Sequence, residues 1–516
     1  MRVEQNIADF FERAATVFKD RIGIIDEPGP NSLGEMSYGE LIQHGQALAA
    51  ALDSMNISKG QRVAIVSKNS ARFITAFYGV SGFGRILVPI NYRLSSEDIQ
   101  YIIDHSKSSL LLYDPDLETL VESLEGVQKL ALNNTNNSVL FKFDAKPQSQ
   151  EVEENFPASI NYTSGTTAKP KGVVLTHRNL WTNAVLMGLH LGLQDNETYL
   201  HTLPMFHCNG WGMPYIVTGM GGRHIIIEKI DGHEILERIA KHNVTIMCGA
   251  PTVLQAVLAA AESWQGEIPG GGRLRVLVAG APPPSSVIHQ VRKTLNWEFM
   301  QLYGLTETSP LLTMNRVRHE WDDLSEFQKS QQLGKAGTPA IGVKLKISEE
   351  GEILAKSNSV LDHYWENPVA SEAALNEGWF HTGDGGTLDE SGYLTISDRK
   401  KDVIITGGEN VSSIEVEDVI YSHPEVSEVA VIGAFHHKWG EQVTALVVLK
   451  AGANISEQEI IDYCRSQLSH FKCPKAVHFR TSLPRTATGK LQKYKLREPF
   501  WKNKRQFNHG DGAELT

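Results

Sequence analysis

The chain has 516 residues, which is too long for one hydrophobic core and predicts more than one folded unit. Apolar residues make up 41% of it and charged residues 21%, as is ordinary for a soluble globular protein. The net charge is −11 and no extended basic region precedes the C-terminal end, which makes nucleic acid a poor candidate partner.

The ends of the chain and its cysteines bear on location. The first residues, MRVEQNIADF, include acidic side chains and lead into no long apolar run, so we expect no secretory signal. We also expect no transmembrane segment, because no apolar run approaches the roughly 18 residues of a spanning helix. The cysteines form no CxxC pair and no metal-site spacing. The final residues, AELT, are not a peroxisomal address, and the expected location is cytoplasmic.

Strands alternate with helices in the first part of the chain. The hydrophobic pattern predicts strands at 62–67, 86–90 and 110–113, and helices at 71–80 and 96–105. This alternation is typical of a mostly parallel sheet with helices on both faces. The predicted fold class is therefore α/β, with a large N-terminal domain of mixed and parallel sheets flanked by helices. The pattern weakens over 121–154, which we interpret as a surface excursion.

The most informative stretch follows at 162–172, YTSGTTAKPKG. Its hydroxyl groups and glycines suit the close approach of an anion, and its two lysines neutralise negative charge. A flexible surface loop has a similar composition. Because the hydroxyls come first, the lysines last, and apolar residues flank the run, the order favours a polyphosphate site. It is not a Walker A loop, because Gly172 is followed by Val173.

Two later motifs add groups suited to a nucleotide. In YGLTE at 303–307, a tyrosine ring can stack on a base, Thr306 can reach a phosphate, and Glu307 offers an oxygen ligand for Mg²⁺. In HTGD at 381–384, Asp384 can bind ribose hydroxyls. A helix cap and a turn-capping aspartate are the alternative interpretations of the two motifs. Strands predicted at 244–248 and 274–279 end in glycine and proline, and such loops form the ligand crevice of a parallel sheet.

The character of the chain changes at the charged cluster DRKKD, 398–402. We predict a large domain over 1–398, a hinge at 399–401, and a small mobile α+β domain over 402–516, of which 506–516 is expected to be disordered. Within the small domain, strands are predicted at 403–405, 428–433 and 443–449, and helices at 413–422 and 457–468. Near its end, Lys490 follows a glycine. It is either a solvated lysine or an ammonium that stabilises charge on phosphorus.

In this order, the motifs resemble the adenylate-forming acyl-CoA synthetases of the ANL superfamily, most of all the medium- and long-chain fatty acyl-CoA ligases. The resemblance covers about residues 10–500. It implies that ATP phosphates contact Thr163, Ser164, Gly165, Thr166, Thr167, Lys169 and Lys171. It places adenine against Gly280, Ala281, Pro282, Tyr303 and Gly304.

The resemblance also implies the remaining roles. Thr306 binds phosphate and Glu307 binds Mg²⁺. Asp384 and Arg399 hold the ribose. Lys401 is the hinge, Lys490 promotes adenylation, and Gly408, lacking a Cβ, lets the pantetheine of CoA pass in a second orientation of the small domain. The implied partners are a carboxylic acid, ATP, Mg²⁺ and CoA. A homodimer and a peripheral membrane contact are compatible with the resemblance.

The implied reaction joins the acid to AMP, releases pyrophosphate, and then transfers the acyl group to CoA. The segment MFHCNGW at 205–211 matches the border of the acyl pocket, where His207 and Trp211 are bulky enough to close it; core packing of Trp211 is the alternative. A medium- or long-chain fatty acid is the leading interpretation. An aryl acid or a short thioether or branched acid, a carrier protein in place of CoA, and a nucleotide-binding regulator on an inactive scaffold remain open.

Overall fold

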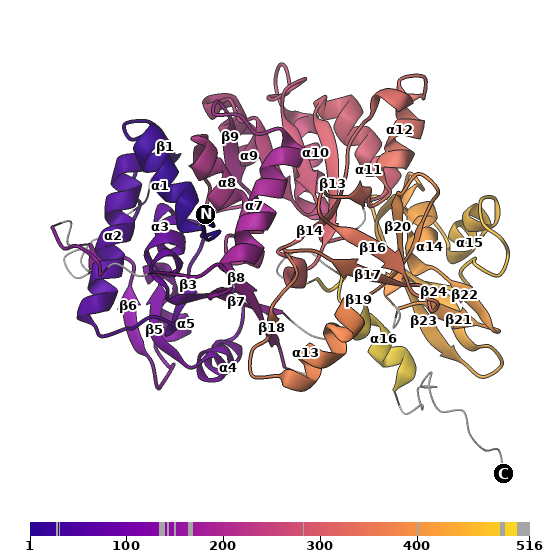
Figure 1. Ribbon diagram of the computed structural model, residues 1–516. Helices are drawn as coiled ribbons and strands as arrows, with labels where there is room; N and C mark the ends of the chain where they lie inside the picture. The colour runs from indigo at the N-terminus through magenta and orange to yellow at the C-terminus, as the bar shows by residue number, and fades with distance from the viewer. Residues whose placement is uncertain are drawn as a thin grey trace, which may run out of the picture.

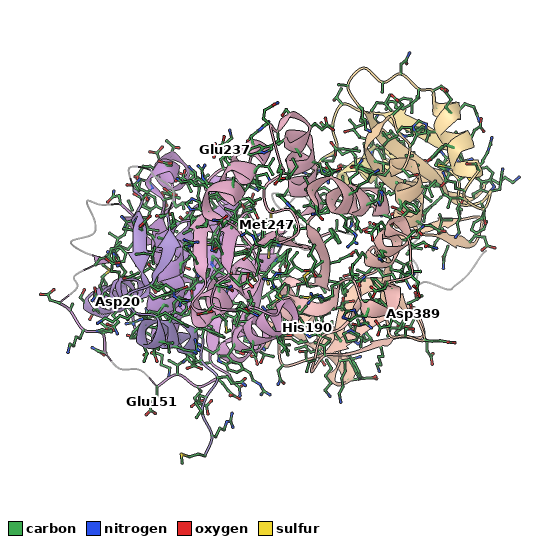
Figure 2. The ribbon with its side chains drawn as sticks, turned by 90° about the horizontal axis from the view of Figure 1, so that it is seen from above. Asp20, Glu151, His190, Glu237, Met247 and Asp389 are labelled. Carbon is green, nitrogen blue, oxygen red and sulfur yellow. The ribbon has the colours of Figure 1, made fainter. Side chains whose placement is uncertain are left out.

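The computed structural model describes residues 1–26, 29, 31–133, 140–141, 144–148, 151–163, 169–281, 283–399, 402–485 and 491–502, with the backbone alone at 398 and 399. The disorder predicted for 506–516 lies outside the described residues. The predicted fold class is confirmed: a large N-terminal domain of mixed sheets and helices carries a small domain at one end, and both views show this arrangement (Figures 1 and 2).

The first sheet has seven strands in the order β18-β8-β7-β4-β3-β5-β6. Strands β3 to β7 pair in parallel, and antiparallel pairs β7–β8 and β8–β18 close one edge. Every residue of β4 is buried, as expected of a parallel strand covered on both faces. The bounds are β3 (Arg62–Val66), β4 (Ile86–Ile90), β5 (Ser108–Tyr113), β6 (Gln128–Ala131), β7 (Pro157–Thr163), β8 (Lys171–Thr176) and β18 (His363–Tyr364).

The second sheet has nine strands in the order β15-β14-β13-β12-β11-β9-β10-β1-β2, parallel from β13 to β1. Because β12 and β13 are parallel neighbours, the loops that follow them meet at one edge. The bounds are β1 (Ile22–Ile25), β2 (Glu35–Ser37), β9 (Thr198–His201), β10 (Arg223–Ile226), β11 (Ile246–Gly249), β12 (Arg275–Val278), β13 (Glu298–Gly304), β14 (Leu311–Asn315) and β15 (Thr338–Pro339).

Two further sheets complete the fold. The four strands β16 (Lys344–Ile347), β17 (Glu352–Lys356), β19 (Phe380–Leu388) and β20 (Leu394–Arg399) are antiparallel. The small domain holds a five-stranded sheet made of β21 (Ile404–Thr406), β22 (Glu409–Val411), β23 (Val426–His436), β24 (Gly440–Leu449) and β25 (Ala476–Phe479).

Helices cover these sheets (Figure 1). In the large domain they are α1 (Ala8–Val17), α2 (Tyr38–Ser54), α3 (Ala71–Gly79), α4 (Ser96–Ser106), α5 (Glu118–Val121), α7 (His177–Leu191), α8 (Met213–Met220), α9 (Gly232–His242), α10 (Pro251–Ser263), α11 (Ser285–Gln290), α12 (Glu326–Leu333) and α13 (Pro368–Ala374). In the small domain they are α14 (Ser413–Tyr421), α15 (Glu457–Arg465) and α16 (Lys493–Trp501). No helix of the described residues is both long and apolar enough to cross a membrane.

Most of the predicted elements appear within a few residues of their expected bounds. Strand β4 matches its prediction residue for residue, whereas β23 runs longer at both ends than expected. The interpretation of 121–154 as a surface excursion was wrong in part, because β6 forms there and pairs with β5. The sequence of β6, QKLA, shows only a weak alternation of polar and apolar residues. Because β6 is an edge strand that packs on a single neighbour, it does not need a strong hydrophobic pattern.

Candidate functional site

The run at 162–172 spans a hairpin between β7 and β8. Thr163 pairs with Lys171 at the end of the hairpin next to its loop. Residues 164–168, which include Ser164, Gly165, Thr166 and Thr167, lie outside the described residues. The two lysines lie over aromatic rings. Lys169 Nζ is 5.1 Å from the ring centroid of Tyr101, and Lys171 Nζ is 5.1 Å from that of Tyr364. Such contacts direct an ammonium group without neutralising it, so the positive charge stays available to an anion.

Glu307 lies beside this hairpin. It sits in the short helix η5 (Thr306–Thr308), and the hydroxyl of Tyr364 donates to its Oε1 at 2.9 Å. Tyr364 belongs to β18, which pairs with β8. Thr306 and Glu307 are both half-buried. One tyrosine therefore contacts the carboxylate through its hydroxyl and Lys171 through its ring face. Tyr364 cannot be predicted from the sequence, because a two-residue strand far along the chain carries no motif.

Tyr303 and Asp384 meet in the structure, although 81 residues separate them in the chain. The Tyr303 hydroxyl donates to Asp384 Oδ2 at 3.0 Å, and both side chains are buried. Asp384 is also the register partner of Arg399 across β19 and β20. The sequence spacing of fifteen residues between these two therefore reflects a simple hairpin. The predicted ribose pair and the predicted adenine residue are brought together.

Two glycines near Tyr303 differ in the space around them. A Cβ on Gly304 would lie 1.5 Å from the carbonyl oxygen of Pro310, so no larger residue fits there. Gly280 follows β12 with a φ of +93°, and space is open where its Cβ would be. Ala281 is half-buried beside it, and Pro282 lies outside the described residues. Since β12 and β13 are parallel neighbours, Gly280 and Tyr303 lie at the same sheet edge.

The segment predicted to border the acyl pocket contains a left-handed turn. Five consecutive residues have positive φ: Cys208, Asn209, Gly210, Trp211 and Gly212. Each residue with a side chain costs about 1–2 kcal/mol in this region, so the fold holds the turn against its local preference. The Cys208 thiol lies 3.8 Å from the carbonyl oxygen of Thr306, and burial raises its pKa. The turn therefore contacts the segment that carries Glu307.

Within this turn, Trp211 is buried and 4% exposed, whereas His207, just before it, is half-buried. The carbonyl of Trp211 accepts a hydrogen bond from Asn183 Nδ2 at 3.2 Å. The backbone that carries the indole is therefore fixed. Burial alone does not separate the wall of a short pocket from core packing.

In the small domain, Gly408 lies at the tip of the β21–β22 hairpin. Gly407 and Gly408 have φ values of +62° and +89°, as a two-residue hairpin turn with both residues left-handed requires. Space is open where a Cβ on Gly408 would be. The N–H of Gly407 donates to the carbonyl of Trp439 at 2.9 Å, and the Trp439 ring stacks on His436 at 4.2 Å. No motif in the sequence marks Trp439.

Residues 486–490, including Lys490, and Lys401 lie outside the described residues. The chain on either side of 486–490 is fastened to the small domain. Arg485 pairs with Glu428 at 2.6 Å, and Lys493 pairs with Glu417 at 2.7 Å. Arg485 and Leu491 also form an antiparallel bridge. The residues on both sides of the segment that contains Lys490 are therefore held by contacts within the small domain.

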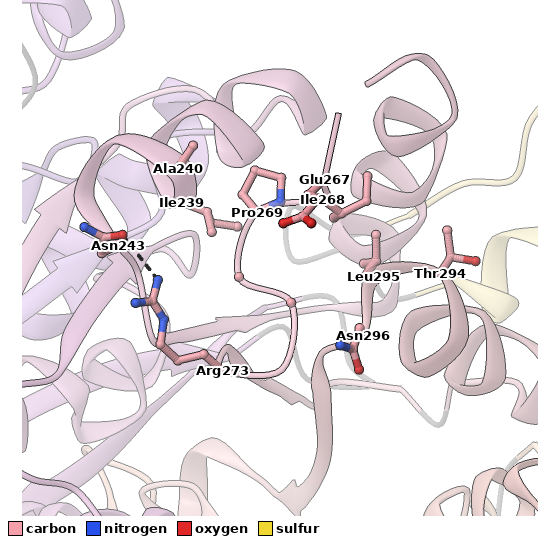
Figure 3. Close-up of a pocket in the computed structure, with 12 residues that line it drawn as sticks. Ile239, Ala240, Asn243, Glu267, Ile268, Pro269, Arg273, Thr294, Leu295 and Asn296 are labelled. Atoms are coloured by element: carbon pink, nitrogen blue, oxygen red, sulfur yellow. Dashed lines mark hydrogen bonds between the residues drawn. The ribbon is translucent and has the colours of Figure 1, made fainter. Parts of the chain in front are cut away.

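A depression of about 590 Å³ lies at the opposite edge of the nine-stranded sheet (Figure 3). It is lined by the end of α9, the loop before β12 and the residues before β13, among them Asn243, Arg273 and Asn296. These are the amino ends of the strands, whereas Gly280 follows the carboxyl end of β12 and Tyr303 lies at the carboxyl end of β13. The depression therefore takes no part in the site. No cluster of three or more His, Cys, Asp or Glu side chains that could hold a metal occurs among the residues described.

The chain matches known proteins along nearly its whole length. The family model described as AMP-binding enzyme matches residues 11–365, and that described as AMP-binding enzyme C-terminal domain matches residues 415–490. A 4-hydroxybutyrate–CoA ligase of Metallosphaera sedula is 33% identical over 95% of this chain and 93% of its own. A 2-methylpropanoate–CoA ligase of Humulus lupulus and a peroxisomal benzoate–CoA ligase of Arabidopsis thaliana are each 34% identical over 95% of this chain and 94% and 92% of theirs.

Solved structures agree. An anthranilate CoA ligase in complex with anthranoyl-AMP has a TM-score of 0.85 at 25% identity and covers 97% of this chain and 98% of its own. An O-succinylbenzoate coenzyme A synthetase from Bacillus subtilis, in complex with ATP and magnesium, has a TM-score of 0.81 at 28% identity over 96% and 100%. A fatty acyl CoA synthetase of Mycobacterium tuberculosis has 0.73 at 30% identity over 96% and 98%. The chain is therefore an acid–thiol ligase that belongs to the AMP-binding enzyme family.

Proposed function

We propose that the protein activates a short carboxylic acid, branched, hydroxylated or aromatic, as its acyl-adenylate and transfers the acyl group to CoA. In the first step an oxygen of the acid attacks the α-phosphorus of ATP, and the bond from that phosphorus to the bridging oxygen breaks to release pyrophosphate. In the second step the thiolate of CoA attacks the acyl carbonyl carbon, and AMP leaves. The acid–AMP anhydride is what makes a poor acyl donor reactive.

ATP and its metal have suitable partners at the hairpin. Lys171 and Lys169 supply charge to the β- and γ-phosphates, and residues 163–167 supply hydroxyl and backbone donors. Glu307, oriented by the Tyr364 hydroxyl, is one carboxylate beside them. Mg²⁺ in nucleotide sites is commonly held by one or two carboxylates, substrate phosphates and water, so this donor set fits it. When bound, Mg²⁺ neutralises charge on the departing pyrophosphate.

The nucleoside has its partners at the sheet edge. Tyr303 holds the carboxylate of Asp384 in one orientation, which prepares it to accept from both ribose hydroxyls. Gly280 leaves a backbone surface to which a flat base can come close, because space is open where its Cβ would be. Gly304 instead lets the backbone of Pro310 pack closely against it. Lys490 supplies positive charge to the first transition state, and Gly408 supports passage of pantetheine in the second step. These roles, like the hinge at Lys401, are part of the proposal.

One observation supports a short acid. Trp211 is buried on a turn whose backbone is pinned by Asn183, beside the segment of Thr306 and Glu307. We infer that this bulky indole lines the acyl pocket and limits its depth. The names of the relatives agree, since they include 2-methylpropanoate, 4-hydroxybutyrate and benzoate ligases.

A medium- or long-chain fatty acid is the second candidate. The similarity to the fatty acyl CoA synthetase of Mycobacterium tuberculosis favours it. A cytoplasmic location and a homodimer stay predictions, and the benzoate ligase among the relatives is named as peroxisomal.

The test is a panel of 2-methylpropanoate, 4-hydroxybutyrate, benzoate, octanoate and palmitate, with AMP formation measured with and without CoA. We expect one of the first three to give the highest kcat/KM, and CoA to be required for turnover. A preference for octanoate or palmitate would establish the second candidate. Turnover with an acyl carrier protein but not with CoA would change the acceptor, and no AMP with any acid would end the proposal. Lys490→Ala serves as the inactive control for pyrophosphate release.

A further inference from the structure

The left-handed turn at 208–212 is hydrogen-bonded to β7, which is the first strand of the hairpin around residues 162–172, called the phosphate hairpin below. Asn209 is fully buried, and its Nδ2 donates to Ser159 Oγ at 2.9 Å and to the Tyr215 hydroxyl at 3.2 Å. Ser159 Oγ also accepts from Asn161 Nδ2 at 3.0 Å. Ser159 and Asn161 belong to β7 and face the same side as Thr163, because alternate residues of a strand share a face. The hairpin strand and the turn thus share one buried hydroxyl.

A second fastening joins the turn to the segment of Glu307. Asn183 of α7 donates to the carbonyl of Trp211 at 3.2 Å, and its Oδ1 accepts from the N–H of Leu311 at 3.1 Å. Leu311 begins β14, four residues after Glu307. The turn is therefore held between the strand of the phosphate hairpin and the segment of the candidate magnesium ligand.

Stability alone does not explain an asparagine at position 209. Its φ is +45°, where glycine is accommodated without steric cost. Its Oδ1 is buried and has no hydrogen-bond partner among the described residues, and an unsatisfied buried carbonyl lowers stability. Asn161 Oδ1 is in the same condition. What the amide of Asn209 does supply is a fixed distance between the turn and β7.

We propose that Asn209 is a positioning residue. Through its hydrogen bond to Ser159, it holds the turn at 208–212 at the distance from the phosphate hairpin that brings the acid to the α-phosphorus of ATP. This inference rests on the proposed function. It concerns the first step, in which acid and ATP are separate molecules and their alignment depends on the protein. In the second step a covalent bond already joins the acyl group to AMP, so the same displacement matters less.

The test compares the two steps in Asn209→Gly, which keeps the positive φ and removes the amide. The acid is the member of the panel with the highest kcat/KM. We expect acid-dependent exchange of pyrophosphate into ATP to fall about 100-fold, the loss expected for a misplacement near 1 Å, while thioester formation from the synthetic acyl-AMP is nearly unchanged. Asn243→Gly is the matched control, because Asn243 has a φ of +53° and lies at the depression on the opposite sheet edge (Figure 3).

Ser159→Ala and the double variant with Asn209→Gly distinguish an effect of Asn209 through Ser159 from a general loss of folded enzyme. If Asn209 acts through Ser159, the double variant is no slower in the first step than the slower single variant. Losses that multiply would contradict the connection, and an equal fall in both steps would mean that less enzyme is folded. An unchanged first step in Asn209→Gly would overturn the inference and leave the proposed function intact. A wild-type protein that forms no AMP with any acid would instead end the proposed function.

Discussion

At the residue scale, the groups of the candidate site are oriented by hydrogen bonds and ring contacts from neighbouring side chains. Tyr364 orients Glu307 and lies under Lys171, Tyr303 orients Asp384, and Asn183 pins the backbone of Trp211. Each of these partners is buried or half-buried, where a hydrogen bond to a charged group contributes more than at the surface. The side chains of the candidate site are thereby held in place by the fold itself.

Tyr364→Phe tests the orientation of Glu307. The substitution keeps the ring under Lys171 and removes the hydroxyl that donates to Glu307 Oε1. A hydrogen bond to a charged group contributes about 1.5–3 kcal/mol, so we expect the Mg²⁺ concentration for half-maximal pyrophosphate release to rise at least about tenfold. Tyr113→Phe is the control, since its hydroxyl donates to Glu118 at 2.5 Å, away from the hairpin. If both variants required the same Mg²⁺ concentration, the Tyr364 hydroxyl would not contribute to Mg²⁺ binding.

Trp211→Ala tests the depth of the acyl pocket. If the indole forms the pocket wall, its removal lets longer acids in, and the peak of kcat/KM moves to longer chains in a series of straight-chain acids. Because truncating a buried tryptophan costs about 3–5 kcal/mol of stability, Trp211→Phe is measured beside it as the milder change. A lower thermal midpoint with the same chain-length profile would assign Trp211 to core packing.

At the element scale, the turn at 208–212 is an irregular part of the large domain, with five consecutive residues of positive φ. Helix α7 and strand β7 both contact it through polar side chains, Asn183 and Ser159. The parallel pairing of β12 and β13 supplies a regular edge for Gly280 and Tyr303, so the candidate site combines regular strands with one irregular segment.

Buried histidines on neighbouring elements make stability depend on pH. His177 begins α7, and His201 and His224 lie on β9 and β10 with His201 Nε2 and His224 Nδ1 2.9 Å apart. Burial lowers the pKa of His177 and of His224 from 6.5 to about 3, and lowers the pKa of His201 well below its ordinary value. The unfolded chain takes up these protons near pH 6.5, whereas the folded chain does not. Their contribution is therefore complete above pH 6.5 and is lost as the pH falls.

His177→Asn makes this measurable. The asparagine oxygen can accept from the N–H of Ile7, as His177 Nδ1 does at 3.4 Å, and it does not titrate. We expect the free energy of unfolding of the wild type, relative to this variant, to fall by up to about 1.4 kcal/mol per pH unit below pH 6.5. Urea unfolding at pH 7.5, 6.5, 5.5 and 5.0 gives that difference. A difference that stays constant with pH would show that His177 takes up its proton at the same pH in the folded protein as in the unfolded chain.

At the scale of the whole molecule, the small domain has ion pairs of its own and contacts the large domain through α14. Within it, Lys493 pairs with Glu417 and Arg497 with Asp402. Across the boundary, α14 meets α10 and α11, where Gln255 donates to the Tyr421 hydroxyl at 2.6 Å and the N–H of Ser285 donates to Asp418 at 3.2 Å. Burial at this contact raises the pKa of Asp418. The change of orientation that we propose between the two steps would have to break these contacts.

Tyr421→Phe tests this attachment. Losing one hydrogen bond across the boundary, about 1 kcal/mol, raises the detached population about fivefold. The sequence DRKKD offers trypsin sites at Arg399, Lys400 and Lys401. We expect cleavage there to be faster by a similar factor, while Tyr463→Phe, whose hydroxyl bonds Ser422 inside the small domain, is cleaved as the wild type. Equal rates would mean that the boundary contact does not limit detachment.

The sequence by itself determined the fold class, most strands and helices, and the family, because buried parallel strands read as apolar runs and the phosphate hairpin is continuous in the chain. It also placed Thr163, Lys171, Tyr303, Glu307 and Asp384 on the candidate site. Only the tertiary structure showed that Tyr364 reaches Glu307, that Tyr303 reaches Asp384, and that the turn at 208–212 is left-handed and fastened to β7. These contacts join residues distant in the chain, and no local pattern carries them, since sheet pairing and side-chain packing decide which residues meet.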